Sequence, residues 1–304
     1  MSFEKRRESG MGALELDRHL LIRAGVLFVC EGLLSKMSGM GEPFLQVLWA
    51  IGASMVAMVL LRRLPTSVIL GIGLAWLVGS KWALTRFFPI ELAADVADRP
   101  VLELLFMTAG AKSSLLVFYP MTHWLAMMLL GWAFGCFLLA RPDTGQRRED
   151  TEKLLILCRL SALLLWAFVQ SNNGYRNLGL LRDDTTIVQC LHMSKYPPAL
   201  VYSLMELGLM ALILVLFLRF ERRIKDIQRP NNPLLVFGQT ALFFYVLHFI
   251  ILGGAAMAWT GGMNLRGLQE TYLAAGATIA LLYPICIGYR ALKKKHPKSV
   301  LQYF

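Results

Sequence analysis

A series of long apolar runs constrains this sequence more than any other feature. Each run is about 20 residues long, which is the length that an α-helix needs to cross a hydrocarbon core of about 30 Å. Over the whole chain 56% of the residues are hydrophobic and 17% are charged, and the mean hydropathy is +0.54. We therefore predict an all-α, polytopic integral membrane helix bundle with about eight transmembrane helices. The expected spans are residues 16–34, 44–61, 65–82, 120–140, 154–170, 197–218, 233–252 and 271–290.

The basic residues indicate the orientation of this bundle. Twenty of the 31 Lys and Arg fall on one side of the expected arrangement, in the N-terminal segment, three connecting loops and the C-terminal tail. Cytoplasmic loops of membrane proteins carry an excess of Lys and Arg, so this side and both termini are predicted to be cytoplasmic. The expected organisation is a basic cytoplasmic segment at 1–15, a transmembrane bundle at 16–290 and a basic cytoplasmic tail at 291–304.

The charge and the cysteines argue against other classes of protein. The net charge is +11, but its Lys and Arg lie in short clusters beside apolar runs, which favours contact with membrane lipid and not with nucleic acid. The five cysteines are scattered without a CxxC spacing, so neither a metal site nor a disulfide framework is predicted. The first apolar run follows basic residues, as in a signal peptide. It contains Arg23 and Glu31 and lacks a clear cleavage site, so we interpret it as a retained helix.

Two expected outer loops, residues 83–119 and 171–196, are unusually long. Loops of this length often fold over a site or act as lids, although an ordinary surface connection is the alternative. The second loop begins with a polar SNNGYRN segment. Its Asn172 and Asn173 are candidates for binding substrate hydroxyls, and the alternative is a simple turn.

Three histidines are expected near the outer face of the membrane. His123 lies just inside the fourth span, His192 just before the sixth span, and His248 near the outer end of the seventh span. A neutral imidazole takes a proton from an amine or hydroxyl nucleophile and later returns one to a leaving group, as acyl transfer requires. The alternative is that each histidine forms a structural hydrogen bond to a neighbouring helix.

Other polar side chains at membrane depth are further candidates, because burial of such groups in hydrocarbon is costly. Glu206 in the sixth span, and Gln46 and Trp49 in the second, are predicted to face the bundle interior. Glu206 is the functional candidate of the three, whereas Gln46 also suits a hydrogen bond between helices.

The segment that contains Lys195 and Tyr196 precedes the sixth span. Its two prolines are predicted to occupy the first turn of that helix, where a missing N–H group costs little. Lys195 and Tyr196 then lie at the membrane surface, either as anchors or, for Lys195, as a group that attracts an anion.

A dense basic patch on the expected inner face suits the phosphates of a cytoplasmic acyl donor such as acetyl-CoA. Topology and contact with anionic lipid are the alternative explanation. The patch consists of Arg219, Arg222, Arg223, Lys225 and Arg229.

Several of these segments together resemble a known family. They are QVLWAIG (46–52), FYPMTHWLAMMLLGWAFG (118–135), SKYPPAL (194–200), NPLLVFGQTALFFYVLH (232–248) and the closing LLYPIC with its basic tail. In this order they resemble bacterial DUF1624 proteins, which are related to the heparan-α-glucosaminide N-acetyltransferase catalytic domain. The resemblance covers the chain from about residue 18 to the C-terminus.

The resemblance implies a multi-helix bundle in the bacterial cytoplasmic (inner) membrane that moves an acetyl or other acyl group from cytoplasmic acyl-CoA to a sugar or amino sugar outside. His248 matches the histidine of the family's FFYxLH segment, and Lys195 and Tyr196 match its KYPP segment. His123 stands where relatives more often carry a proline.

The front of the chain departs from that family. Relatives begin with additional helices that carry an Arg-Gly pair, an Asp-His pair and the histidine regarded as catalytic, and nothing here matches that region. Three explanations of this difference are open. The reading frame starts too late, the missing part is a separate polypeptide, or the chain is a shortened non-catalytic relative. A partner chain or a homo-oligomer would then cover the polar helix faces.

The leading hypothesis is therefore a membrane acyltransferase, or its larger fragment, with His248, His123 and Glu206 as candidate catalytic residues. A second hypothesis is a non-catalytic protein that binds a glycan or serves as a scaffold. A third is a secondary transporter, against which the absence of sequence repeats argues.

Overall fold

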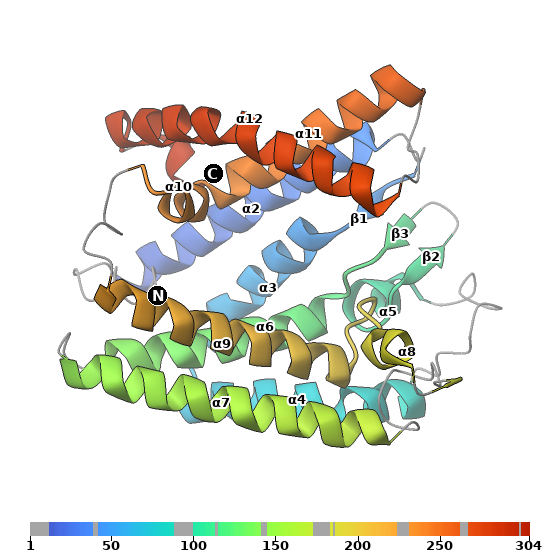
Figure 1. The fold of residues 1–304 in the computed structure, drawn as a ribbon. Helices are drawn as coiled ribbons and strands as arrows, with labels where there is room; N and C mark the ends of the chain where they lie inside the picture. Colours follow the sequence, from blue (N-terminus) through green and yellow to red (C-terminus); the bar gives the residue numbers. More distant parts are fainter. Residues whose placement is uncertain are drawn as a thin grey trace. The chain divides into compact units, whose positions relative to one another are not determined.

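The computed structural model describes residues 12–38, 42–87, 100–112, 115–140, 145–172, 183–184, 186–223, 231–261, 267–297 and 299–304, without the side chains of residues 85, 221–223 and 260. Within these ranges the chain forms eleven α-helices, three short strands and one 3₁₀ helix (Figure 1). The predicted all-helical class is confirmed.

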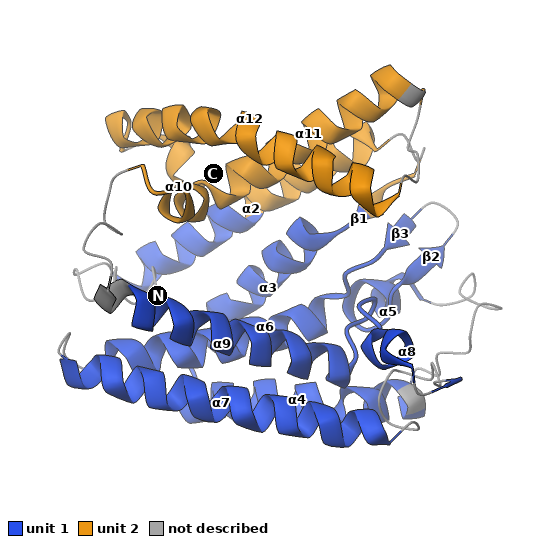
Figure 2. Ribbon diagram, in the orientation of Figure 1, with its two compact units in different colours: residues 1–24, 45–223 blue, residues 25–44, 224–304 orange. Residues whose placement is uncertain are grey.

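The chain forms two compact units (Figure 2). Unit 1 comprises residues 1–24 and 45–223, and unit 2 comprises residues 25–44 and 224–304. The first described helix, α2 (Ala13–Met37), contributes its first half to unit 1 and its second half to unit 2.

Unit 1 is a bundle built around five long helices. Helix α6 packs against α3 and α4, and α7 packs along α9. Apolar side chains fill the contacts: Leu129 of α6 packs with Met58 and Ile69, and Leu155 of α7 packs with Val215. The helices are α3 (Val47–Leu61), α4 (Thr66–Phe87), α6 (Met121–Leu139), α7 (Gly145–Ser171) and α9 (Leu200–Arg223).

Short elements lie in the connections of unit 1. Strands β2 (Gly110–Lys112) and β3 (Leu115–Val117) pair antiparallel, with Ala111 opposite Leu116, and β3 lies between β2 and β1 (Phe44–Leu45). Two short helices, α5 (Val101–Phe106) and α8 (Ile187–Leu191), precede α6 and α9 respectively.

Unit 2 contains α10 (Pro233–Gln239), α11 (Ala241–Thr260), α12 (Leu268–Lys295) and the 3₁₀ helix η2 (Val300–Gln302). Both α10 and α11 pack against α12. The rings of Phe243 and Tyr289 stack with centroids 3.9 Å apart, and the Tyr289 hydroxyl donates to the Leu301 carbonyl at 3.3 Å. The segment after α12 therefore folds back onto that helix.

Six of the described helices are long and apolar enough to cross a membrane, namely α4, α6, α7, α9, α11 and α12. The first expected span coincides with α2, which carries six charged residues and is not among the six. The second coincides with α3, whose 15 residues extend over about 22 Å.

Two predicted boundaries are wrong. The seventh expected span, 233–252, is divided at Thr240 into α10 and α11, and α11 continues to Thr260 because the apolar sequence continues to Trp259. The two prolines before α9 do not form its first turn, because the helix begins only at Leu200. In the preceding turn the Ser194 hydroxyl donates to the Pro197 carbonyl at 3.1 Å, and the Ala199 N–H donates to the Ser194 carbonyl at 2.9 Å.

Candidate functional site

An aromatic cluster with one lysine lies at one end of unit 1, where α6 and α9 both begin. The hydroxyls of Tyr119 and Tyr196 are 3.1 Å apart, and their ring centroids are 5.0 Å apart. Phe118 contacts Tyr196 at 5.3 Å and Trp124 contacts Tyr119 at 5.0 Å between ring centroids. We call Phe118, Tyr119, Trp124, Lys195 and Tyr196 the aromatic cluster.

The ammonium group of Lys195 lies over two rings of this cluster. Its Nζ is 5.8 Å from the centroid of Tyr119 and 5.4 Å from that of Tyr196, within the range of cation–π attraction. Lys195 is half-buried, whereas Tyr196 is 43% exposed. The cluster therefore offers an accessible aromatic face beside a positive charge.

The chain reaches this cluster through two ordered turns. On one side β3 leads directly into Phe118, whose N–H donates to the Leu45 carbonyl at 3.1 Å, and Pro120 then begins α6. On the other side the turn before α9 contains a cis Tyr196–Pro197 peptide bond. Tyr119 and Tyr196, which are 77 positions apart in sequence, meet where these two turns lie side by side.

Contacts beneath the aromatic cluster join the two expected outer loops. Leu84 near the end of α4 packs with Ala199 and Val201 at the start of α9. The Trp166 indole donates to the Met193 sulfur at 3.4 Å, and the Gln170 side-chain amide donates to the Cys190 carbonyl. Met107 of the first expected loop and Met193 of the second both pack against the group of Leu84, Ala199 and Val201, so parts of the two loops lie at the same end of unit 1.

His123 lies in the first turn of α6, directly before Trp124 of the aromatic cluster. Its side chain is only 4% exposed and meets the Trp76 indole edge-on, with centroids 5.7 Å apart. Within the part of the chain that the structure describes, neither ring nitrogen of His123 has a hydrogen-bond partner. A buried imidazole of this kind has both nitrogens available to a ligand.

His248 belongs to unit 2 and lies in the middle of α11, not near its end as predicted, because the helix continues for twelve residues beyond it. Its Nδ1 lies 3.3 Å from the Phe244 carbonyl, and its ring stacks on that of Phe244 at an interplanar angle of 10°. This contact is a hydrogen bond in the tautomer that carries a proton on Nδ1, because a carbonyl oxygen only accepts.

The remaining predicted residues are dispersed. Glu206 is exposed on α9, so the prediction that it faces the bundle interior is wrong: the inward positions of this stretch are taken by neighbours such as Ser203 and Leu204. Gln46 and Trp49 are half-buried at the start of α3, as expected of polar groups between helices. Asn172 and His192 are exposed.

The predicted donor-binding patch lies largely outside the described residues. This applies to Arg229 and to the side chains of Arg222 and Arg223, and also to Asn173 of the second loop. Among the described residues no group of three His, Cys, Asp or Glu side chains is arranged to hold a metal ion.

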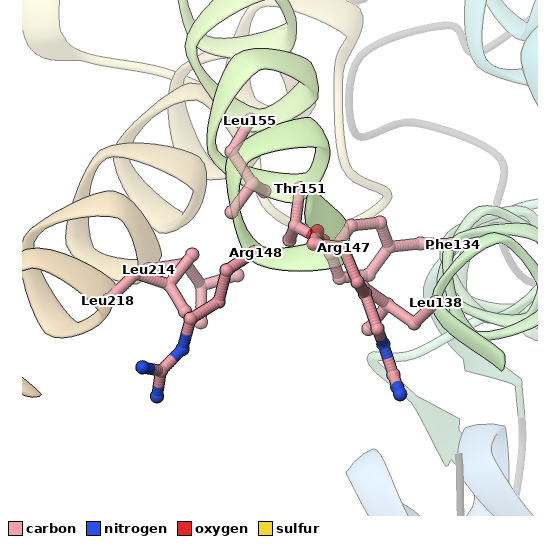
Figure 3. A pocket seen from close by; sticks show the side chains of 8 residues that line it. All are labelled: Phe134, Leu138, Arg147, Arg148, Thr151, Leu155, Leu214 and Leu218. Carbon is pink, nitrogen blue, oxygen red and sulfur yellow. The ribbon is translucent and has the colours of Figure 1, made fainter. Parts of the chain in front are cut away.

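Two pockets with basic linings were not predicted. In unit 1 a pocket of about 290 Å³ lies between α6, α7 and α9, with Arg147 and Arg148 at its rim (Figure 3). In unit 2 a pocket of about 330 Å³ is lined by Arg290, Lys293 and Lys294 from α12. In the sequence these residues indicate only the cytoplasmic side of the membrane.

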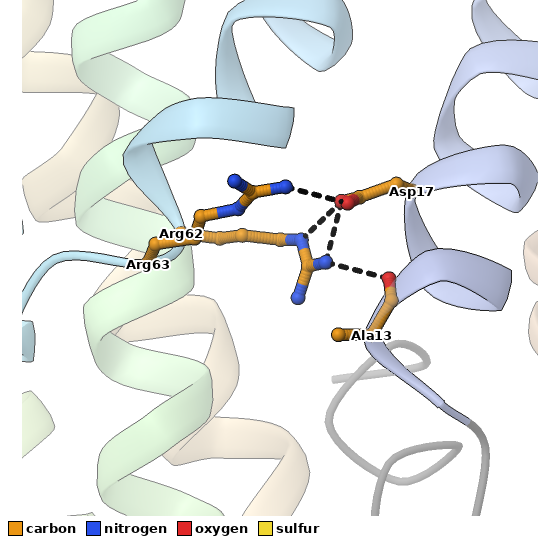
Figure 4. A network of polar contacts seen from close by, with 4 residues as sticks. All are labelled: Ala13, Asp17, Arg62 and Arg63. Atoms are coloured by element: carbon orange, nitrogen blue, oxygen red, sulfur yellow. Dashed lines mark hydrogen bonds and ion pairs between the residues drawn. The ribbon is translucent and has the colours of Figure 1, made fainter.

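A buried ionic network was also missed (Figure 4). The Asp17 carboxylate accepts hydrogen bonds from Arg62 Nε and Arg63 Nη2, each at 2.9 Å, and Arg62 also donates to the Ala13 carbonyl at 2.9 Å. The network joins α2 to the turn after α3.

The fold defines a class of protein. Six apolar helices long enough to cross a bilayer, with large apolar side chains exposed along α7, belong to a multi-pass helical membrane protein. The exposed residues recur on one face of α7 at Leu157, Leu160, Leu164 and Phe168. Comparisons of the chain with protein families, curated proteins and solved structures gave no match.

Proposed function

We propose that this protein is a membrane acyltransferase, or the larger part of one, that transfers an acetyl or other acyl group from cytoplasmic acyl-CoA to a sugar or amino sugar outside. The observation that carries the proposal is the aromatic cluster beside the buried, unpartnered His123. Aromatic faces pack against the C–H faces of sugar rings, and Lys195 and the two tyrosine hydroxyls supply polar contacts at the same place. The resemblance of the KYPP and FFYVLH segments to sugar acetyltransferases supports the same chemistry.

The proposed topology has eight transmembrane helices in a bacterial cytoplasmic membrane, with both termini in the cytoplasm. In this topology α2 and α3 are the first two transmembrane helices, and the six long apolar helices are the other six. The distribution of Lys and Arg supports this orientation, since their excess marks the cytoplasmic side. The aromatic cluster then faces outward and the two basic pockets face the cytoplasm.

In the proposed reaction a histidine accepts a proton from the sugar amine or hydroxyl as that group attacks the acyl carbonyl. The C–O or C–N bond of the product forms, the thioester C–S bond breaks, and the proton passes to the leaving thiolate. His248 is the leading candidate for this role because it matches the histidine of the FFYxLH segment in the family that the chain resembles. His123 is the second candidate, and Glu206 is the third.

The acyl donor is proposed to bind through its phosphates to basic side chains of the inner face. Arg222, Arg223 and Arg229 remain candidates from the sequence, and the pocket of Arg290, Lys293 and Lys294 adds a second site of the same charge. A homo-oligomer or a complex with a partner chain is proposed as the assembly in the membrane.

The test is labelled acetyl transfer from acetyl-CoA to glucosamine-containing acceptors, with membranes that express the chain. We expect His248→Ala to abolish transfer and Tyr196→Ala to raise the acceptor KM more than tenfold, because truncation removes a ring that stacks in the cluster. His296→Ala, which changes an exposed histidine after α12, is the matched control and should retain activity. Full activity of a folded His248→Ala variant would place the chemistry elsewhere.

Binding of a glycan without transfer is the second candidate function. The composition of the aromatic cluster favours it, because aromatic rings and an ammonium group bind ligands, and the cluster itself contains neither a histidine nor a carboxylate to act as a general base. Trp124 contacts Tyr119, so occupation of the cluster should change tryptophan fluorescence. A fluorescence change that Trp124→Phe removes, in a chain without acetyl transfer, would favour the binding function over the enzyme.

A further inference from the structure

The pocket of unit 1 combines an apolar wall with a basic rim. Its volume is about 290 Å³, and Figure 3 shows Arg147 and Arg148 extending from α7 toward the same side, away from the leucines. Thr151, whose hydroxyl donates to the Arg147 carbonyl at 2.7 Å, lies between rim and wall. The apolar wall comes from three helices and consists of Phe134, Leu138, Leu155, Leu214 and Leu218.

An ion pair holds two walls of this pocket together. Arg219 Nε of α9 lies 2.7 Å from a carboxylate oxygen of Glu152 on α7. These residues directly follow Leu218 and Thr151, which line the pocket. The ion pair adds to the apolar packing of Leu155 with Ala211 and Val215, which holds α7 against α9 beside the pocket.

The length of α7 places the pocket at the boundary between hydrocarbon and headgroups. Its 27 residues extend over about 40 Å, whereas the hydrocarbon core is about 30 Å thick. The part of α7 that exceeds the hydrocarbon thickness costs least if it is the charged first turns, which end at Lys153 and extend into the headgroup region. The apolar part of the helix begins at Leu154. Arg147 and Arg148 then lie at the depth of lipid phosphates, and Leu155 lies at the depth of the first acyl carbons.

We propose that this pocket binds one anionic phospholipid, with its phosphate at Arg147 and Arg148 and one acyl chain against the leucine wall. Guanidinium groups pair with phosphate oxygens through charge-assisted hydrogen bonds, and basic pockets between transmembrane helices bind anionic headgroups. The charge complementarity and the apolar wall are needed together only for a ligand that is itself amphipathic. The proposal does not depend on the proposed acyl transfer.

Native mass spectrometry of the purified full chain in detergent tests the proposal. Dioleoylphosphatidylglycerol and dioleoylphosphatidylcholine, which share their acyl chains, are titrated separately. We expect one phosphatidylglycerol to bind at least tenfold more tightly than phosphatidylcholine. Arg147→Gln/Arg148→Gln should weaken binding of phosphatidylglycerol about thirtyfold, from the attraction of two basic residues near an anionic lipid.

Two further variants distinguish binding of the lipid in the pocket from its general electrostatic attraction to the basic protein surface. Arg18→Gln/Lys153→Gln removes two exposed positive charges that do not line the pocket, and it should change the affinity less than threefold. Leu218→Trp fills the apolar wall without changing the charge and should weaken both lipids. Equal losses in the two glutamine variants, or unchanged binding in Leu218→Trp, would overturn the proposal. Displacement of the lipid by palmitoyl-CoA at lower concentration would likewise overturn it, because an acyl-CoA would then be the occupant.

Discussion

Replacement of Asp17 by Asn is expected to destabilise unit 1 more than a single surface substitution does. The Asp17 side chain is 10% exposed and that of its main partner Arg62 is 8% exposed, so the pair is buried. Removal of one partner of a buried ion pair costs about 3 to 5 kcal/mol, because the other charge remains in a poorly solvated place. Arg62 keeps its hydrogen bond to the Ala13 carbonyl, and Asn keeps one acceptor oxygen. We therefore expect the lower limit, about 3 kcal/mol.

Arg63→Gln is the matched control. Arg63 donates to the same carboxylate, but its side chain is 59% exposed, so its loss should cost less than about 1 kcal/mol. The double variant Asp17→Asn/Arg62→Gln should recover a large part of the loss seen in Asp17→Asn, because no unpaired buried charge remains.

Equilibrium unfolding in mixed micelles of dodecyl maltoside and sodium dodecyl sulfate, followed by far-ultraviolet circular dichroism, measures these differences. The reasoning requires Asp17→Asn to lose at least 2 kcal/mol more than Arg63→Gln, from the difference between buried and exposed pairs. Equal losses in the two single variants would refute it, because the Asp17–Arg62 pair would then behave as a solvated one.

Two further outcomes are expected. Gly208→Ala should be about 1 to 2 kcal/mol less stable than Gly131→Ala in the same unfolding assay, because its new Cβ would lie 2.9 Å from Leu163 Cδ2 between α7 and α9. A Cβ at Gly131 meets no atom within 4 Å, and both variants gain the same helix propensity. Leu84→Ala, at a fully buried position beneath the aromatic cluster, should cost about 2 to 5 kcal/mol, whereas Leu164→Ala at the exposed face of α7 should cost far less.

Hydropathy predicted the helices because a bilayer allows few alternatives. A chain in hydrocarbon satisfies its backbone N–H and C=O groups within helices, so apolar runs of sufficient length are helical. Every expected span overlaps at least one described helix for this reason. The break at Thr240 escaped prediction because Gly238, Gln239 and Thr240 interrupt the apolar sequence too briefly to divide a span by hydropathy. The Thr240 hydroxyl donates to the Val236 carbonyl at 2.8 Å, a local contact that hydropathy does not record.

Side-chain partners were much less predictable than helix positions. Topology placed His123 and Lys195 near one face, because each lies where an expected span begins on that side. The contact between Tyr119 and Tyr196 depends on the conformation of the turns that precede α6 and α9, and hydropathy carries no information about it. The same limitation explains Glu206, whose position in the sequence indicates its depth along α9 but not its face.

The aromatic cluster and the proposed lipid pocket lie toward opposite ends of α9. From Leu200, which follows the cluster, to Leu218 in the pocket the helix rises about 27 Å, close to the thickness of a hydrocarbon core. Residues so far apart share no contacts, so substitutions at the two ends should act additively on stability within about 0.5 kcal/mol. Tyr196→Ala combined with Leu218→Trp tests this in the unfolding assay. A larger deviation would show that α9 transmits a change from one membrane face to the other, as an enzyme with its donor and acceptor on opposite sides would require.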